Sequence, residues 1–209
     1  MPVAAINPAP KRQARGEARI DQILLAAAKS FGEQGYEATT TNGIAARAGI
    51  SPGSLYQFFT NKDDIAHALA TRYMEQLSDV QAESFTVPEG VALDQVVSSA
   101  VGSIVDFNLA HPGFKALFAR PDMPESMRAA AAPVNERLQE RVRDMVAALI
   151  PALDDQRLDV TVVVVLHTVK GLLPPIVAAT ESMRSTLVGE LEHSLTAYLR
   201  SVAATAGSA

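Results

Sequence analysis

The sequence contains no cysteine, so disulfides, thiolate metal sites and thiol nucleophiles are excluded, and a cytoplasmic location is expected. Residues 1–14 lack the apolar core and the small-residue cleavage site of a signal peptide, and we expect a disordered tail there. The four histidines show neither HxxxH nor HExxH spacing, so no metal and no cofactor are expected.

Long uninterrupted hydrophobic runs are also missing. The most apolar segment, Leu158 to Ala179, is long enough to cross a membrane, but Asp159, His167 and Lys170 interrupt it, and Pro174-Pro175 would break a helix. We therefore expect a buried helix there and no membrane partner.

The valine-rich part of that segment, residues 160–166, has the composition of a buried strand. Every neighbouring segment has a helical pattern, and a lone strand cannot satisfy its backbone hydrogen bonds. The sequence therefore predicts a helix, with tertiary packing overriding propensity.

Charge is unevenly distributed along the chain. The net charge is −5, yet residues 1–62 hold seven Lys and Arg against four Asp and Glu, which gives +3 there and leaves −8 for the rest. A basic N-terminal segment on an acidic body places positive potential where phosphates could be met and repels DNA elsewhere.

Hydrophobic residues make up 48% of the chain, which is ample for a core, and they recur at helical spacing. The stripes lie at about residues 20–31, 44–48, 55–59, 65–77, 93–107, 134–149 and 187–202. No internal repeat is present. The pattern predicts an all-α fold.

One segment carries the signals of two short helices joined by a tight turn. Thr39–Thr41 supply N-cap hydroxyls for the first helix, and Gly49 can adopt the left-handed conformation that ends it. Ser51 can cap the second helix, with Pro52 at its first position, and residues 60–64 resemble a capped start of another helix. This geometry lets a helix N-terminus enter the major groove of DNA.

The residues at these positions closely resemble the DNA-binding domain of TetR-family regulators. The matching residues are Phe31-Gly32, Gly35-Tyr36, Ala38-Thr39-Thr40, Ile44-Ala45, Ala48-Gly49-Ile50-Ser51, Gly53-Ser54-Leu55-Tyr56, Phe59 and Asn61-Lys62. The resemblance is strong over residues 15–64 and implies an N-terminal three-helix helix-turn-helix domain followed by a helical-bundle domain for ligand binding and dimerisation. The expected boundaries are a tail at 1–14, the DNA-binding domain at 15–62, the helical domain at 63–203 and a tail at 204–209.

The resemblance implies that Thr40, Tyr56 and Lys62 meet the phosphate backbone of double-stranded DNA, contacts that position the protein and carry little sequence information. Base reading is expected from residues at the starts of the two short helices. These are Thr41, Asn42, Pro52, Gly53, Ser54 and Gln57, and the interface also includes Ser51 and Arg47. Arg47 is interpreted either as a DNA contact or as a solvated charge. The third helix has no arginine, so bidentate guanine recognition from it is not available.

The resemblance also implies an effector cavity among the middle helices. The candidate effector residues are Phe107, His111, Phe114, Phe118, Met127, Met145 and His167. The alternative is that they are ordinary core residues, with His167 a hydrogen-bonded core histidine. Their shortage of charge favours a small apolar or weakly polar effector.

The function expected from the resemblance is a repressor that binds a palindromic operator as a homodimer and is released by its effector. The dimer would pair the last two helices, at about 156–180 and 184–202, as a four-helix bundle. The rival hypothesis is a helical small-molecule-binding or enzymatic protein that keeps the DNA domain as a scaffold. Gly49 to Gly53 match the G-x-S-x-G motif of hydrolases, but that motif needs a strand before its serine, so no enzymatic activity is expected.

Overall fold

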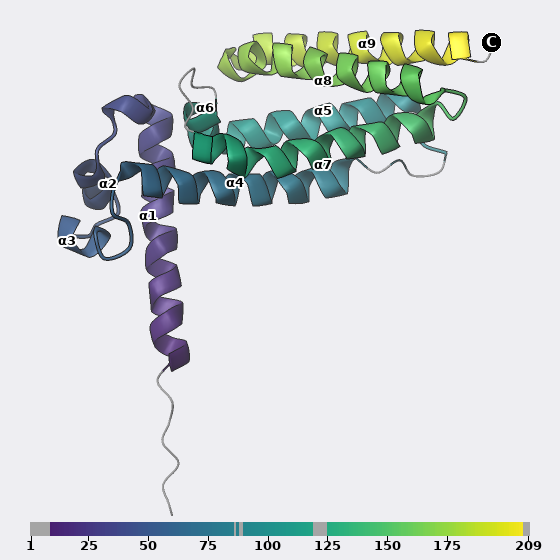
Figure 1. Ribbon diagram of the computed structural model, residues 1–209. Helices are drawn as coiled ribbons and strands as arrows, with labels where there is room; N and C mark the ends of the chain where they lie inside the picture. The colour runs from purple at the N-terminus through teal and green to yellow at the C-terminus, as the bar shows by residue number, and fades with distance from the viewer. Residues whose placement is uncertain (1–8, 86, 88–89, 119–124, 207–209) are drawn as a thin grey trace, which may run out of the picture. The chain divides into compact units, whose positions relative to one another are not determined.

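The computed structural model describes residues 9–85, 87, 90–118 and 125–206, and within them the secondary structure is entirely helical, as predicted. Figure 1 shows the order of the helices along the chain. They are α1 (Ala9–Ala38), α2 (Thr41–Arg47), α3 (Pro52–Leu55), α4 (Lys62–Ser84), α5 (Leu93–Ala110), α6 (Pro112–Phe118), α7 (Glu125–Leu149), α8 (Asp155–Ala178) and α9 (Glu181–Ala206).

The chain divides into two compact units. The N-terminal unit contains the residues up to Arg72 together with His111–Met127, and the C-terminal unit contains Tyr73–Ala110 and Arg128–Ala209. The predicted boundary at residue 62 stays a prediction, but the N-terminal unit has a component that the sequence did not indicate. Helix α6 begins at residue 112, 28 residues after α4 ends at residue 84, and still packs on α1.

Both predicted tails are shorter than expected. Helix α1 begins at Ala9, so residues 9–14 are helical, and α9 continues to Ala206, so residues 204–206 are helical too. Lys, Arg, Gln and Ala, which fill these segments, are good helix formers, and Pro10 is tolerated in a first helical turn. Residues 1–8 and 207–209 lie outside the described residues.

The core of the N-terminal unit forms around the apolar face of α1. Ile23, Ala27 and Phe31 are completely buried, together with Ile44 of α2 and Leu55 of α3. Gly35, with a φ of 77°, interrupts α1 a few residues after the hydrophobic stripe at about residues 20–31.

The close packing of α6 on α1 depends on a glycine. A Cβ atom at Gly32 would lie 3.0 Å from the Cβ of Pro112 and 3.3 Å from the backbone nitrogen of Gly113. Any side chain at position 32 would therefore push the first turn of α6 away from α1.

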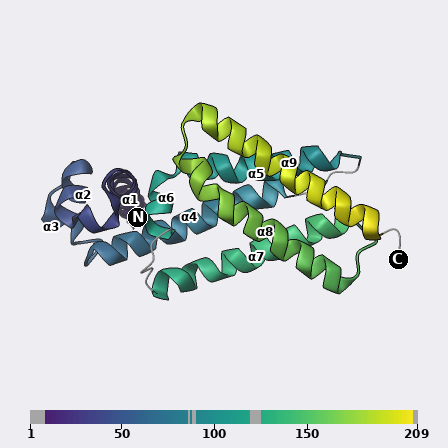
Figure 2. The same cartoon turned by 90° about the horizontal axis from the view of Figure 1, so that it is seen from above.

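The C-terminal unit has its own hydrophobic core, to which α5, α7, α8 and α9 contribute. Its buried members include Val97 of α5, Val146 of α7, Val162 of α8 and Leu195 of α9. Figure 2 shows α8 and α9 side by side within this unit. Ser98 of α5 also donates a hydrogen bond to Glu192 of α9, at 3.0 Å.

Helix α8 confirms the predicted helix in the valine-rich segment, but two further expectations are wrong. The prolines 174 and 175 do not break the helix, which continues to Ala178. The carbonyl groups of Lys170 and Gly171, which lose their hydrogen bonds to the proline positions, belong to exposed residues and can be solvated by water.

The helix is also not buried on all sides. Val162 and Val165 face the core, whereas Val160, Val163 and Val164 are exposed on the opposite face. A valine-rich segment is apolar around its whole circumference, so its sequence does not reveal that only one side meets the core.

Candidate nucleic-acid interface

The two short helices of the N-terminal unit begin at the capping residues that the sequence predicted. The side chain of Thr40 accepts a hydrogen bond from the Gly43 amide at 3.1 Å, and Ser51 accepts one from the Ser54 amide at 3.1 Å. Gly49 between the helices has a φ of 66°, in the left-handed region. The helix-turn-helix is therefore specified by local backbone chemistry.

Helix α4 begins with a reciprocal capping arrangement. Asn61 Oδ1 accepts a hydrogen bond from the Asp64 amide at 2.8 Å, and Asp64 Oδ2 accepts one from the Thr60 amide at 3.0 Å. Two backbone N–H groups are satisfied in this way. The capped start predicted for residues 60–64 is confirmed.

The turn and α3 are held on the core by contacts with other elements. Gln22 of α1 donates a hydrogen bond from Nε2 to the carbonyl of Ala48, at 2.6 Å, which ties the end of α2 to α1. Leu55 and Phe59 are buried. This anchoring leaves the start of α3 free to present its outer side to solvent.

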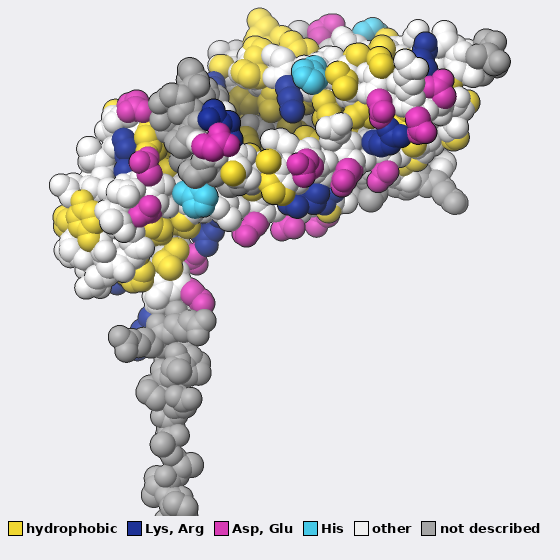
Figure 3. Space-filling view, in the orientation of Figure 1, with side chains coloured by type: hydrophobic (Ala, Val, Ile, Leu, Met, Phe, Trp, Pro, Cys, Tyr) yellow, Lys and Arg dark blue, Asp and Glu magenta, His cyan; other side chains and the backbone are white. Residues whose placement is uncertain are grey.

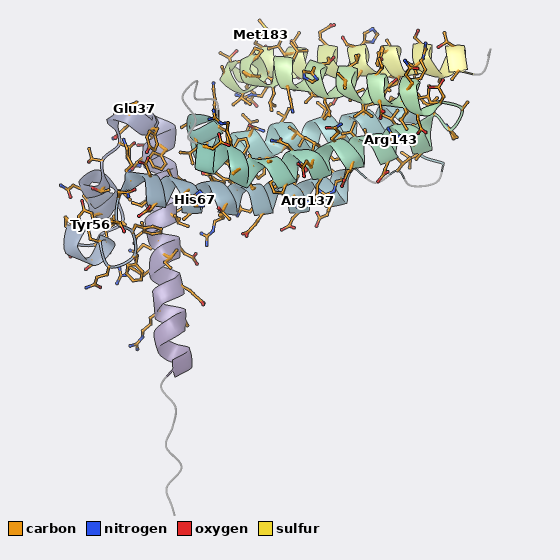
Figure 4. The ribbon with its side chains drawn as sticks, in the orientation of Figure 1. Glu37, Tyr56, His67, Arg137, Arg143 and Met183 are labelled. Atoms are coloured by element: carbon orange, nitrogen blue, oxygen red, sulfur yellow. The ribbon has the colours of Figure 1, made fainter. Side chains whose placement is uncertain are left out.

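The exposed side of α3 carries a hydroxyl pair. Tyr56 is 51% exposed, and its hydroxyl lies 3.0 Å from Thr41 Oγ1 of α2. Figure 4 shows Tyr56 at the outer edge of α3. The pair links the two short helices. Because one hydroxyl donates to the other, one O–H group remains to donate to an external acceptor.

Lys62 is partly engaged within the protein. Its Nζ donates hydrogen bonds to the carbonyls of Tyr36, at 2.8 Å, and Glu37, at 3.4 Å, and lies 4.2 Å from the centre of the Tyr36 ring. These contacts fix the start of α4 to the end of α1. An ammonium has three donors, so one remains available for a phosphate.

Arg47 is paired with an acidic residue that the sequence analysis had not considered. Its Nη1 and Nη2 donate to the two carboxylate oxygens of Glu33, at 2.8 and 2.5 Å. This hydrogen bond lowers the pKa of Glu33 and raises that of Arg47. The guanidinium is thus held by a carboxylate in the DNA-free protein, and its contact with DNA stays a prediction.

The remaining candidates for base reading differ in availability. Asn42 and Gln57 are exposed, and within the described part of the chain their amides have no side-chain hydrogen bond. Ser54 is less available because its hydroxyl lies 2.9 Å from the Ser51 hydroxyl. Phe58, beside Gln57, is an exposed aromatic side chain that was not among the candidates. Leu55 and Phe59 are four residues apart and share the buried face, so the sequence indicated that Phe58 points to another side.

The predicted effector residues fall in different units. His111, Phe114 and Phe118 belong to the N-terminal unit, where the two phenylalanine rings lie 4.6 Å apart, whereas Phe107 and Met145 are buried in the C-terminal unit. The side chain of Met127 lies outside the described residues.

His167 is not a core residue, although one of the two interpretations of the sequence was a hydrogen-bonded core histidine. It is exposed on α8, and its Nδ1 lies 2.8 Å from the carbonyl of Val163. It is on the side of α8 that does not face the core of its unit, so it does not line a cavity within that unit.

The C-terminal unit contains a cavity of about 380 Å³ between the end of α4 and α7. Met145 is the predicted effector residue that lines it. Its polar walls come from Gln81 and Arg141, which the sequence analysis missed because they are far apart in the chain and have no motif.

Metal binding and membrane spanning are two further possibilities for the described residues. No group of three or more His, Asp or Glu side chains there could hold a metal ion. One described helix, α8, is long and apolar enough to span a membrane by length and composition, properties that core helices of soluble proteins share. Arg143 of α7 pairs with Asp155 and Asp159 on this helix.

Two family models match the chain. The first, described as "Bacterial regulatory proteins, tetR family", covers residues 23–69, and the second, described as "Tetracyclin repressor-like, C-terminal domain", covers residues 92–199. The first match contains α2 and α3, and the second extends from the end of the α4–α5 connection into α9.

Curated relatives and solved structures are similar over much of the chain. The uncharacterized HTH-type transcriptional regulator YhgD of Bacillus subtilis is 26% identical over 133 residues, which are 64% of this chain and 66% of that protein. The HTH-type transcriptional activator FasR of Mycolicibacterium smegmatis is 30% identical over 145 residues, which are 68% of this chain and 62% of that protein. The chain therefore spans just under two thirds of these relatives. A crystal structure of a TetR-family regulator from Streptomyces coelicolor has a TM-score of 0.60 and 24% identity, with 88% of this chain and 99% of that chain covered, and shows the same fold.

Proposed function

Because the chain belongs to the TetR family of bacterial transcriptional regulators, we propose that it is a cytoplasmic repressor that binds a palindromic operator as a homodimer and is released by a small effector. The observation that carries this proposal is the capped helix-turn-helix with the outer side of α3 exposed. Regulators of this family bind DNA as dimers, and the relatives compared above carry the names of transcriptional regulators.

The contacts with DNA divide into two kinds. The hydroxyl pair of Thr41 and Tyr56 and the remaining donor of Lys62 suit phosphate oxygens, which accept hydrogen bonds from such groups in any sequence. The uncommitted amides of Asn42 and Gln57 suit adenine edges. With no arginine on α3, sequence preference would come from amide and methyl contacts and from DNA shape.

The proposed dimer uses the outer side of α8 and α9. Val163 is 49% exposed and Met183 is 55% exposed, and Figure 3 shows hydrophobic surface over the end of this helix pair. A second copy related by two-fold symmetry would cover both patches at once. Binding of this dimer to a palindromic operator would require the two α3 helices to lie about 34–36 Å apart or a multiple of one DNA turn apart.

The test is operator binding by the full chain, measured by fluorescence anisotropy on the DNA upstream of its own gene. Tyr56→Phe and Lys62→Ala should both weaken binding, and Lys62→Ala should also reduce the dependence of affinity on salt concentration by about one counterion. Arg137→Ala, which removes an exposed cation from α7, is the matched charge control. Equal effects of Arg137→Ala and Lys62→Ala would refute the phosphate assignment.

The direction of regulation has its own test, because one relative carries the name of an activator. A reporter gene behind the operator should be expressed more strongly when the regulator is deleted. Lower expression on deletion would show activation in place of repression. A helical binding protein or enzyme that merely retains the DNA domain predicts no specific operator binding at all.

A further inference from the structure

The cavity of the C-terminal unit has the dimensions of a ligand site. Its volume of about 380 Å³ lies in the range of small-molecule pockets, about 300–1,000 Å³. Phe85, Val87 and Met145 form an apolar wall, and Gln81, Arg141 and Asp144 supply polar groups. All six belong to one compact unit.

Gln81 lines this cavity and has a side-chain amide nitrogen without an acceptor among the described residues. The residue is 1% exposed, and its Oε1 accepts a hydrogen bond from Arg141 Nη1, at 3.4 Å. Arg141 can only donate, so the amide oxygen must face it and the amide nitrogen must point elsewhere. Among the described residues no acceptor receives that nitrogen, and a buried N–H group without an acceptor is destabilising.

Arg141 is a partly buried cation whose partners in the described residues are neutral. Its Nη1 donates to the carbonyl of Ser78, at 2.8 Å, and to Gln81. Arg143, two residues further along α7, differs because it pairs with both Asp155 and Asp159. The guanidinium of Arg141 therefore keeps free donors and forms no ion pair within the described residues, beside a cavity with one apolar wall.

We propose that this cavity binds a monocarboxylate with an apolar body, with the carboxylate held by Arg141 and by the amide nitrogen of Gln81. Charge-assisted hydrogen bonds from a guanidinium fit a carboxylate, and the apolar wall accommodates the rest of the molecule. Asp144, exposed at the rim, would repel a second negative charge and so disfavours dianions such as phosphate esters. This proposal replaces the small effector of the proposed function with a negatively charged one. The release of DNA by this ligand rests on the proposed function.

Ligand binding is tested by titration calorimetry of the full chain without DNA. The probes are hexanoate, octanoate and decanoate, with 1-octanol and octylamine as matched neutral and cationic molecules. Octanoate should bind at least tenfold more tightly than either, and each added methylene should tighten binding by up to about fourfold until the cavity is full. Equal affinity for octanoate and 1-octanol, or tighter binding of octylamine, would overturn the proposal.

Variants locate the binding site. Arg141→Met keeps most of the side-chain length and should abolish the preference for octanoate over 1-octanol, whereas Arg137→Met, on an exposed site one turn earlier in α7, should leave it unchanged. Arg141→Lys keeps the charge and should retain part of the preference, which guards against a loss caused by misfolding. Asp144→Asn should tighten octanoate binding several-fold, because it removes a negative charge from the rim of the cavity. Weaker octanoate binding by this variant would show that the carboxylate does not lie near Asp144, contrary to the proposal.

The two proposals fail separately. If the protein binds its operator but no carboxylate, the function stands and the ligand class is wrong. If it binds octanoate but no operator, the cavity assignment stands and the function is wrong. Release of operator DNA by octanoate from the wild type, but not from a DNA-binding Arg141→Met variant, would support both.

Discussion

The helix-turn-helix and the α8–α9 pair leave different chemistry on the surface. In the former, Ile44 and Leu55 are completely buried and the two short helices are capped by Thr40 and Ser51. In the latter, Val163 and other valines of α8 remain in solvent. The first surface is largely polar and is proposed to meet DNA, whereas the second is apolar and is the surface that the proposed dimer would cover.

The largest effect is expected from a charge on the apolar face of α8. Val163→Arg should abolish the proposed dimer and weaken operator binding more than a hundredfold, because each half-site would then be bound by a separate monomer. Light scattering gives the mass, and circular dichroism should show unchanged helicity. Gln139→Arg, on an exposed position of α7, is the control. A dimeric Val163→Arg protein would remove the distinction between the two surfaces.

A substitution that leaves a cavity in the helix-turn-helix should weaken this domain and leave the proposed dimer intact. Leu55→Ala removes a completely buried side chain and should lower the free energy of unfolding by about 2–5 kcal/mol. Operator affinity should fall while the dimer persists. Thermal unfolding and light scattering measure the two outcomes, and loss of the dimer by this variant would mean that the two regions are not separable.

Loss of a cap should have a smaller effect. Ser51→Ala leaves the Ser54 amide without its acceptor and should cost about 1 kcal/mol, because N-cap replacements by alanine are in that range. Urea unfolding measures it. Ser182→Ala, at an exposed position of α9, should change stability by less than half as much, and equal losses would contradict the capping role.

The smallest effect concerns the pair of Glu33 and Arg47. Glu33→Gln removes the partner charge and should free Arg47, raising operator affinity a few-fold with a steeper salt dependence.

The lowered pKa of Glu33 fixes the direction in which its contribution to stability changes with pH. Its contribution to stability is present above the unfolded-state pKa and is lost as the pH falls through the folded-state pKa. Unchanged affinity in Glu33→Gln would show that Arg47 does not reach DNA.

Local chemistry made the helix-turn-helix predictable. Thr40, Ser51 and Gly49 act within a few residues of themselves, so the caps and the turn could be inferred before any tertiary contact was known. The same holds for the capped start of α4 at Asn61.

Contacts between distant segments were not predictable. Glu33 reaches Arg47 across fourteen positions, and Gln81 meets Arg141 across sixty, with no periodicity or motif to connect either pair. The exposure of His167 was missed because the residues around it are apolar on every side of α8.

The close approach of α6 to α1 at Gly32 has a practical consequence for protein engineering. Regulators are often recombined by exchanging the first part of one chain for that of another. Here the piece that folds as a unit includes His111–Met127 as well as the residues up to Arg72. A graft of residues 1–72 alone would bring a foreign α6 against Gly32, so a functional chimera should transfer both segments together.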